Sequence, residues 1–169
     1  LLASAVGVSG TPIVAAQDEV DCSAIAGGVQ LPETVEGKFN VAMVLIGPHD
    51  DGGWSQAHYE GLEYIAENMD DVHIAYIEMV PEGADSEQVF RSLSRKGFDL
   101  IFGTSFGYMD PTLNVAKKYP DKVFMHCSGF KTGPNMGNYF ARMYQGEYLA
   151  GYMAGLMGFK NVGTVATNP

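Results

Sequence analysis

Short, continuously apolar runs alternate with segments of helical periodicity along this chain, and that alternation restricts the possible fold more than any other feature. The run at 41–46 contains no polar residue, whereas a strand with one wet face would alternate apolar and polar side chains. A run of this kind is typical of a central parallel strand that is covered on both faces. Strands are predicted at 41–46, 72–77, 98–102 and 123–127, with a short one at 139–141 and a last one at 162–166.

The segments between these runs carry apolar residues at helical spacing. The predicted helix starts are Ser55, Asp85 and the pair Asp110-Pro111, and a final helix is predicted at 144–159. Asp85 and Gln88 have the spacing of a capping box, and Gly97 is a typical helix end. Strands that alternate with helices predict the α/β class, with a parallel sheet, helices on both faces and right-handed crossovers.

The chain begins with a segment that has the character of an export signal. Residues 1–16 are small and apolar and carry no charge, which is typical of the end of a secretory signal peptide whose basic start is missing. Val14 and Ala16 fit the small-residue rule for cleavage before Gln17. Residues 17–37 show no periodicity, so they are predicted to form a flexible leader. We therefore expect an exported protein, located in the periplasm or at the outer face of the plasma membrane.

The composition excludes several classes of partner. The formal net charge is -10, with 20 acidic residues against 10 Lys and Arg, whereas nucleic-acid binding needs clustered cations. No phosphate-binding loop or dinucleotide fingerprint occurs, so no cofactor is predicted. His49, Asp50, Asp51 and His58 do not have a recognised metal-ligand spacing, so no metal is predicted either. Whether Cys22 and Cys127 form a disulfide cannot be derived from the sequence.

Three loops follow predicted strands and contain both glycine and aromatic residues. They are 47–55, 103–108 and 128–131. In an open parallel sheet, ligands bind beyond the carboxyl ends of the strands, so these loops should converge on one site. Glycine lets the backbone approach a ligand, and aromatic rings offer flat faces for stacking. The pattern predicts a planar, neutral, ring-containing ligand. The candidate ligand-binding residues are Trp54, Asp51, Gly53, Ser105, Phe106, Gly107 and Ser128.

One loop also matches a catalytic motif. Residues 103–107 have the G-x-S-x-G form of a nucleophile elbow and follow an apolar strand. An elbow requires a helix that starts directly after the serine, but the helix-start signal comes later, at Asp110. His126, the base that chain order allows, lies inside a predicted strand. No catalytic residue is therefore predicted, and a secreted α/β esterase that uses Ser105 is the alternative.

Several motifs together resemble the basic membrane protein family of import receptors. The motifs are Asp50-Asp51-Gly52-Gly53-Trp54-Ser55-Gln56, Tyr59-Glu60-Gly61-Leu62, Gly97-Phe98-Asp99-Leu100-Ile101, Ser105-Phe106-Gly107, Ala116-Lys117-Lys118-Tyr119-Pro120, Gly133-Pro134-Asn135, Tyr139-Phe140-Ala141-Arg142, Tyr148-Leu149-Ala150-Gly151 and Gly163-Thr164-Val165. The resemblance covers residues 38–167, and the order and spacing of the motifs make it specific.

The resemblance implies a type I periplasmic-binding fold, in which two lobes close on a ligand. Characterised members bind purine nucleosides or related compounds and deliver them to an ABC permease in the membrane. The base stacks on aromatic rings, one of which occupies the position of Trp54. Acidic residues are expected near the ends of the first and fourth strands, where this chain has Leu45 and Ser128. A ligand-sensing domain of a regulator shares this fold and is a further alternative.

Members of the family are longer than this chain. The resemblance therefore implies that residues 38–169 form the N-terminal lobe of a substrate-binding protein, with the second lobe missing from the sequence. The helix predicted at 144–159 carries small residues at intervals of four, at Gly146, Ala150, Ala154 and Gly158. This stripe favours close packing of the helix against a neighbour.

Overall fold

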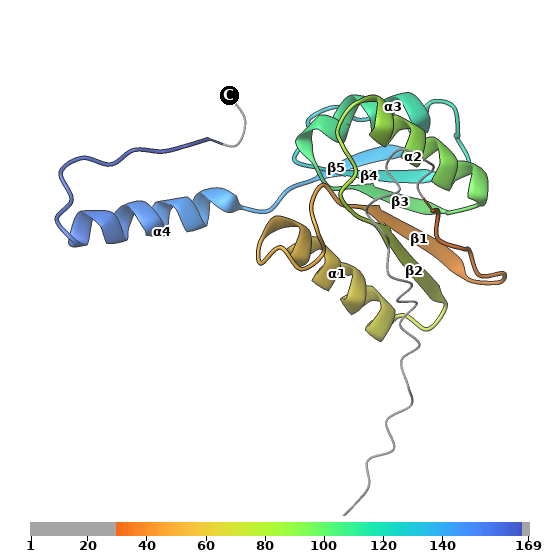
Figure 1. Cartoon of the computed structure of the whole chain (residues 1–169), viewed down its shortest axis with the longest axis horizontal. Coiled ribbons are helices and arrows are strands. Elements are labelled where there is room, and N and C mark those ends of the chain that lie inside the picture. The colour runs from red at the N-terminus through yellow and green to blue at the C-terminus, as the bar shows by residue number, and fades with distance from the viewer. Residues whose placement is uncertain (1–29, 167–169) are drawn as a thin grey trace, which may run out of the picture. The chain divides into compact units, whose positions relative to one another are not determined.

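The computed structural model describes residues 30–166, and a five-stranded parallel sheet is their centre. The strands are β1 (Phe39–Val44), β2 (Val72–Ile77), β3 (Leu100–Gly103), β4 (Val123–Cys127) and β5 (Met136–Tyr139). They lie in the order β2-β1-β3-β4-β5, and each neighbouring pair is parallel. Figure 1 shows this sheet with α1 on one face and α2 and α3 on the other. The predicted α/β class, with a parallel sheet and helices on both faces, is confirmed.

Helices and one 3-10 turn connect the strands. They are α1 (Trp54–Asn68), α2 (Ala84–Lys96), the turn η2 (Phe106–Tyr108), α3 (Met109–Ala116) and α4 (Met143–Leu156). The carboxyl ends of β1, β2, β3 and β5 each open into a loop or turn that precedes a helix, whereas β4 leads through a loop into β5. Loops at the carboxyl ends of parallel strands place ligand sites at one edge of the sheet.

Helix α1 begins one residue earlier than predicted. Trp54 is its first residue, and Ser55, the predicted cap, is fully buried within the first turn. The Ser55 hydroxyl instead accepts a hydrogen bond from the backbone N–H of Gly47, with N and Oγ 3.1 Å apart. The side chain of Asp51 caps the helix, because its carboxylate reaches the unpaired amides of the first turn.

The starts of α2 and α3 also differ from the prediction. Asp85 is the second residue of α2 and does not cap it; no side chain does. An acidic residue in the first turn still interacts favourably with the helix dipole. The predicted end at Gly97 is confirmed, because that residue adopts a φ of 110°, in the left-handed region. α3 begins directly after η2, so Asp110-Pro111 lies in its first turn and not at its start.

The last two predicted strands are shifted or absent. The fifth strand was predicted at 139–141, but the pairing with β4 sets it at Met136–Tyr139, with Phe124 opposite Met136 and Cys127 opposite Tyr139. Residues 162–166, predicted as a strand, form none and are exposed. No strand among residues 30–166 pairs with them, and an apolar run without a hydrogen-bonding neighbour cannot form a ladder. The prediction of a strand there was wrong for the described chain.

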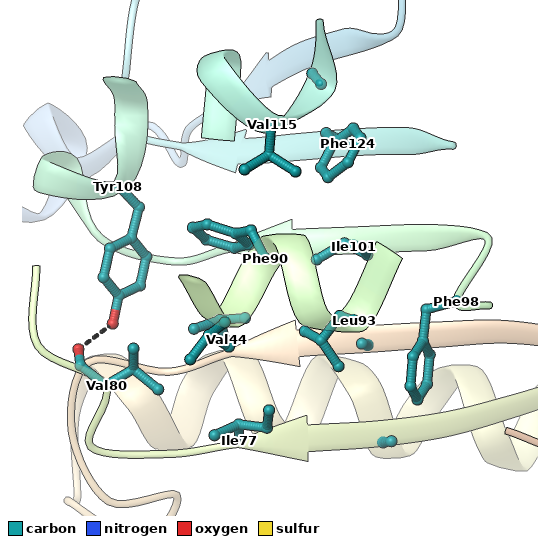
Figure 2. Packing of buried hydrophobic residues seen from close by; sticks show 14 of the residues in the cluster. Val44, Ile77, Val80, Phe90, Leu93, Phe98, Ile101, Tyr108, Val115 and Phe124 are labelled. Carbon is teal, nitrogen blue, oxygen red and sulfur yellow. Dashed lines mark hydrogen bonds between the residues drawn. The ribbon is translucent and has the colours of Figure 1, made fainter. Parts of the chain in front are cut away.

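The larger hydrophobic cluster lies between the sheet and the α2–α3 layer (Figure 2). Its largest fully buried side chains include Phe90, Phe98, Tyr108 and Phe124. Tyr108 donates a hydrogen bond from its hydroxyl to the backbone oxygen of Val80, at 2.5 Å. Burial raises the pKa of Tyr108, so the hydroxyl remains a neutral donor. This bond ties η2 to the loop that follows β2.

The described end of the predicted leader packs against α2 and β1. Lys96 Nζ lies 3.1 Å from the backbone oxygen of Leu31 and 2.6 Å from a carboxylate oxygen of Glu33. The backbone N–H of Val35 donates to the side chain of Asn40 at 2.8 Å. Packing therefore begins before residue 38. The predicted signal segment, the cleavage site and Cys22 lie outside the described residues. Cys127 is a buried thiol whose pKa burial raises to about 11.

Helix α4 differs from the other helices, because none of its residues is buried. Its exposed apolar side chains are Met143, Tyr144, Tyr148, Leu149, Tyr152, Met153 and Leu156. The close packing predicted for its small residues is not made with any part of residues 30–166. Within that range no helix has the length and apolar character that a membrane span requires.

Candidate ligand-binding site

Backbone hydrogen bonds fix the loops that leave the carboxyl ends of the strands. The N–H of Leu45 donates to Ile77 O at 2.8 Å, and the N–H of Thr104 donates to Val44 O at 3.2 Å. The N–H of Ser128 donates to Tyr139 O at 3.0 Å. The segments that follow β1, β3 and β4 therefore leave the sheet at the same edge, as the sequence predicted.

Trp54 joins two of the predicted loops. Its indole N–H donates to the backbone oxygen of Thr104 at 2.5 Å, so the start of α1 is held against the loop that follows β3. The ring is half-buried. Its centroid lies 4.7 Å from that of His58 and 6.4 Å from that of Phe140, which is 59% exposed. Trp54 thus lies in an aromatic group at the carboxyl edge, with part of its surface open to solvent.

The Asp51 carboxylate accepts hydrogen bonds from backbone amides that follow it in the chain. One carboxylate oxygen accepts the backbone N–H groups of Gly53 at 2.8 Å and Gln56 at 3.0 Å, and the other accepts that of Ser55 at 3.0 Å. These hydrogen bonds to the charged form lower the pKa of Asp51 to about 2, from an ordinary value of 3.8. Asp51 and Gly53, both predicted ligand contacts, therefore build the turn that positions Trp54.

We expect Asp51→Ala to lower the melting temperature at neutral pH, and we expect Asp71→Ala, an exposed control, to leave it nearly unchanged. Because the folded pKa lies below the unfolded one, the stabilisation is complete above about pH 4 and is lost as the pH falls through 2. The difference between wild type and Asp51→Ala should therefore shrink between pH 4 and pH 2 in thermal melts. A pH-independent difference would contradict the capping role.

Ser105 forms a junction between three segments. Its hydroxyl donates to the carboxylate of Glu82 at 2.5 Å, and its backbone oxygen lies 2.7 Å from Nε2 of His126. The backbone N–H of Gly107 donates to the same Glu82 oxygen at 2.9 Å. Glu82 lies on the loop that follows β2, which the sequence analysis left out of the site. Its place on the loop between β2 and α2, five residues after Ile77, was the one general signal available.

The same contacts argue against the esterase alternative. His126 is fully buried, and burial lowers its pKa, so the ring is neutral and its Nε2–H donates to the Ser105 carbonyl, not to the hydroxyl. No imidazole within residues 30–166 therefore takes the Ser105 proton. The 3-10 turn also separates Ser105 from α3, whereas an elbow needs a helix directly after the serine.

The remaining predicted residues lie around this junction. Phe106 is 38% exposed in η2, and Ser128 follows β4 with a left-handed φ of 68°. Gly129 lies directly over the imidazole: a Cβ there would come within 2.2 Å of His126 Nδ1, so any other residue would displace the ring. His126 thus links the loop that follows β4 to Ser105, and the three predicted loops converge.

Other surface features do not add a site. Among residues 30–166 no three His, Cys, Asp or Glu side chains gather as metal ligands would. A hollow of about 450 Å³ runs along α2 between Ala84 and Arg95. All of its lining residues come from that one helix, so it is an open groove on a helix face, whereas ligand sites are formed by several elements.

The fold and site define a class. A parallel α/β fold with aromatic and glycine-rich loops at the carboxyl edge of its sheet is an architecture that binds ligands at that edge. The chain belongs to the PnrA-like ABC transporter substrate-binding protein family, whose profile matches residues 38–167. The family consists of ABC transporter substrate-binding proteins, and a structural neighbour at 26% identity is an ABC transporter solute-binding protein; receptors of this class are not enzymes.

Individual relatives support the family and differ in ligand. The chain is 44% identical over 128 residues to a purine-binding protein of Brucella abortus, covering 75% of this chain and 37% of the relative. It is 42% identical over 144 residues to a putative ABC transporter glucose-binding protein of Haloferax volcanii, covering 85% of this chain and 36% of the relative. The chain thus spans little more than a third of the length of these relatives.

A solved structure resembles the fold directly. An ABC transporter solute-binding protein from Conexibacter woesei superposes with a TM-score of 0.61 at 26% sequence identity, covering 69% of this chain and 39% of that one. The parallel sheet and its helices therefore match the fold of part of that solute-binding protein.

Proposed function

We propose that this chain forms the first lobe of an ABC-importer receptor that captures a purine base. The observation that carries the proposal is Trp54, a half-buried ring at the carboxyl edge that is held by its indole hydrogen bond to Thr104. A flat aromatic face in that place favours a planar ring as ligand. The purine-binding relative at 44% identity supports the same chemistry.

A free base fits this edge better than a nucleoside. A ribose presents several hydroxyl groups, which receptors commonly bind with carboxylates. Leu45 and Ser128, the first residues after β1 and β4, supply no carboxylate at those two positions. The groups at this edge are aromatic rings, backbone amides, the Ser105 hydroxyl and the single carboxylate of Glu82 beside it, which suit a heterocycle with few polar substituents.

The proposal includes a second lobe. Helix α4 exposes seven large apolar side chains, and surface of that kind is covered in most soluble proteins. The relatives are more than twice as long as the matched region. We propose that further chain of the receptor covers α4 and closes over Trp54, and that the protein is exported and delivers its ligand to an ABC permease.

Mass spectrometry of small molecules released by denaturing the purified full-length receptor tests this function. We expect a purine base to be enriched over a mock purification from cells that carry an empty vector. Trp54→Ala receptor, purified in parallel, should carry less of it. A hexose enriched in place of a purine, as the glucose-binding relative would favour, would contradict the proposal.

A further inference from the structure

Glu82 contributes a carboxylate to the carboxyl edge, although it comes from a loop without aromatic or ligand motifs. Two hydrogen bonds hold the loop at Val80: its N–H donates to Leu45 O at 3.1 Å, and its backbone oxygen accepts the Tyr108 hydroxyl. Glu82 itself is exposed. Its carboxylate is therefore carried by a loop that is anchored at Val80, and it still faces solvent.

The two carboxylate oxygens of Glu82 differ in the hydrogen bonds that they accept. Oε1 accepts both the Ser105 hydroxyl, at 2.5 Å, and the Gly107 N–H, at 2.9 Å. No residue within 30–166 donates a recorded hydrogen bond to Oε2, so this oxygen keeps its capacity to accept. Two donors orient the carboxylate before any ligand arrives, which reduces the entropy that binding must overcome.

The position of Glu82 relative to Trp54 follows from their shared partners. Trp54 Nε1 binds the backbone of Thr104, and Glu82 binds the side chain of the next residue, Ser105. An aromatic face and an oriented acceptor thus flank adjacent residues of one loop. Trp54 and Glu82 therefore both border the loop at Thr104 and Ser105, where an acceptor beside a ring could bind the hydrogen-bonding edge of a planar heterocycle.

The negative charge at this edge limits the kind of ligand that Glu82 Oε2 can bind. The loops that follow β1 and β2 carry the carboxylates of Asp50, Asp51, Glu78 and Glu82. On the loop that follows β4, Lys131 is already paired with Asp110, with Nζ and Oδ1 2.5 Å apart. An anionic ligand would meet repulsion here, whereas an N–H donor of a neutral ring would gain a charge-assisted hydrogen bond.

We propose that Glu82 is a specificity-determining residue whose Oε2 accepts a hydrogen bond from an N–H group of the bound heterocycle. It thereby supplies the acidic group that Leu45 and Ser128 do not. This inference rests on the proposed purine-receptor function. It predicts preference for rings that carry an N–H donor over analogues in which that donor is methylated.

The test is isothermal titration of the full-length receptor with adenine, N6,N6-dimethyladenine and 9-methyladenine, whose methyl groups block the two possible donors in turn. We expect Glu82→Gln to weaken adenine binding about 10- to 150-fold, the effect of one hydrogen bond to a charged group. For the analogue whose donor is blocked, wild type and Glu82→Gln should bind alike. Glu67→Gln, on the exposed face of α1, is the control and should bind adenine as wild type does.

Gly107→Ala provides a second variant that leaves the charge in place. A Cβ at residue 107 would lie 2.2 Å from the Glu82 carboxyl carbon and must displace that flexible side chain. We expect the same selective loss of adenine affinity, whereas Gly61→Ala, which meets no atom within 4 Å, should bind normally. If Glu82→Gln weakened the binding of all three ligands equally, Glu82 would have only a structural role. If it weakened the binding of none of them, the inference would also be overturned. A wild-type receptor that binds none of them would instead reject the proposed function.

Discussion

Trp54→Ala in the full-length receptor should weaken binding of a purine base about 5- to 150-fold. The estimate uses about 1–3 kcal/mol for one base stacked on an aromatic ring and about 1.4 kcal/mol per tenfold change in affinity. The half-buried ring is anchored at its indole nitrogen and leaves part of its surface open at the carboxyl edge. Isothermal titration measures the loss.

Trp54→Phe distinguishes stacking on the ligand from the structural role of the indole hydrogen bond. Phenylalanine keeps a flat ring but loses the hydrogen bond to Thr104. We therefore expect it to retain most of the affinity and to melt at a somewhat lower temperature. If Trp54→Ala lowered the melting temperature but left the affinity of the folded protein unchanged, the ring would be structural and the stacking proposal would fail.

Phe90→Ala should give the largest loss of stability, about 3–5 kcal/mol in the free energy of unfolding. Phe90 is fully buried between α2 and the sheet, and it packs edge-on against Tyr108 with ring centroids 5.6 Å apart (Figure 2). Removing the ring leaves a cavity beside Gly103, because the ring fills the space next to that residue: a Cβ added at Gly103 would lie 3.0 Å from Phe90 Cζ. Because domains are stable by only about 5–15 kcal/mol, this single change removes a large share.

Phe130→Ala is the matched control, since that ring is 73% exposed. Its effect should stay within about 0.5 kcal/mol. Urea denaturation of the ligand-free receptor, followed by tryptophan fluorescence, measures both variants. Equal effects of the two substitutions would show that the α2–sheet interface is not the stabilising core described here.

The sheet and its helices could be predicted because their signals are local. An apolar run such as 41–46 has few alternatives to a strand covered on both faces, and the observed β1 lies within two residues of it. The helix starts were less predictable, because Asp51 and Ser55 are both good capping residues four positions apart. Which of them caps α1 depends on how the loop closes over Gly47.

Only part of the site could be predicted, because some of its residues are defined by contacts with segments distant in the sequence. Trp54, Ser105 and Gly107 stand in loops whose composition differs from their surroundings, so the sequence marks them. Glu82 stands in an ordinary Pro-Glu-Gly turn, and its role depends on contacts with a segment 23 residues away. The segment 162–166 shows the opposite case, in which a clear strand pattern forms no strand because no described strand is available to pair with it.

Isothermal titration of the full-length receptor with adenine, guanine, hypoxanthine and glucose tests the central claim most directly. We predict that the receptor binds at least one purine base with a single-site isotherm. We predict no measurable binding of glucose, because the edge around Trp54 selects a flat heterocycle. Saturable binding of glucose without binding of any purine would contradict the account.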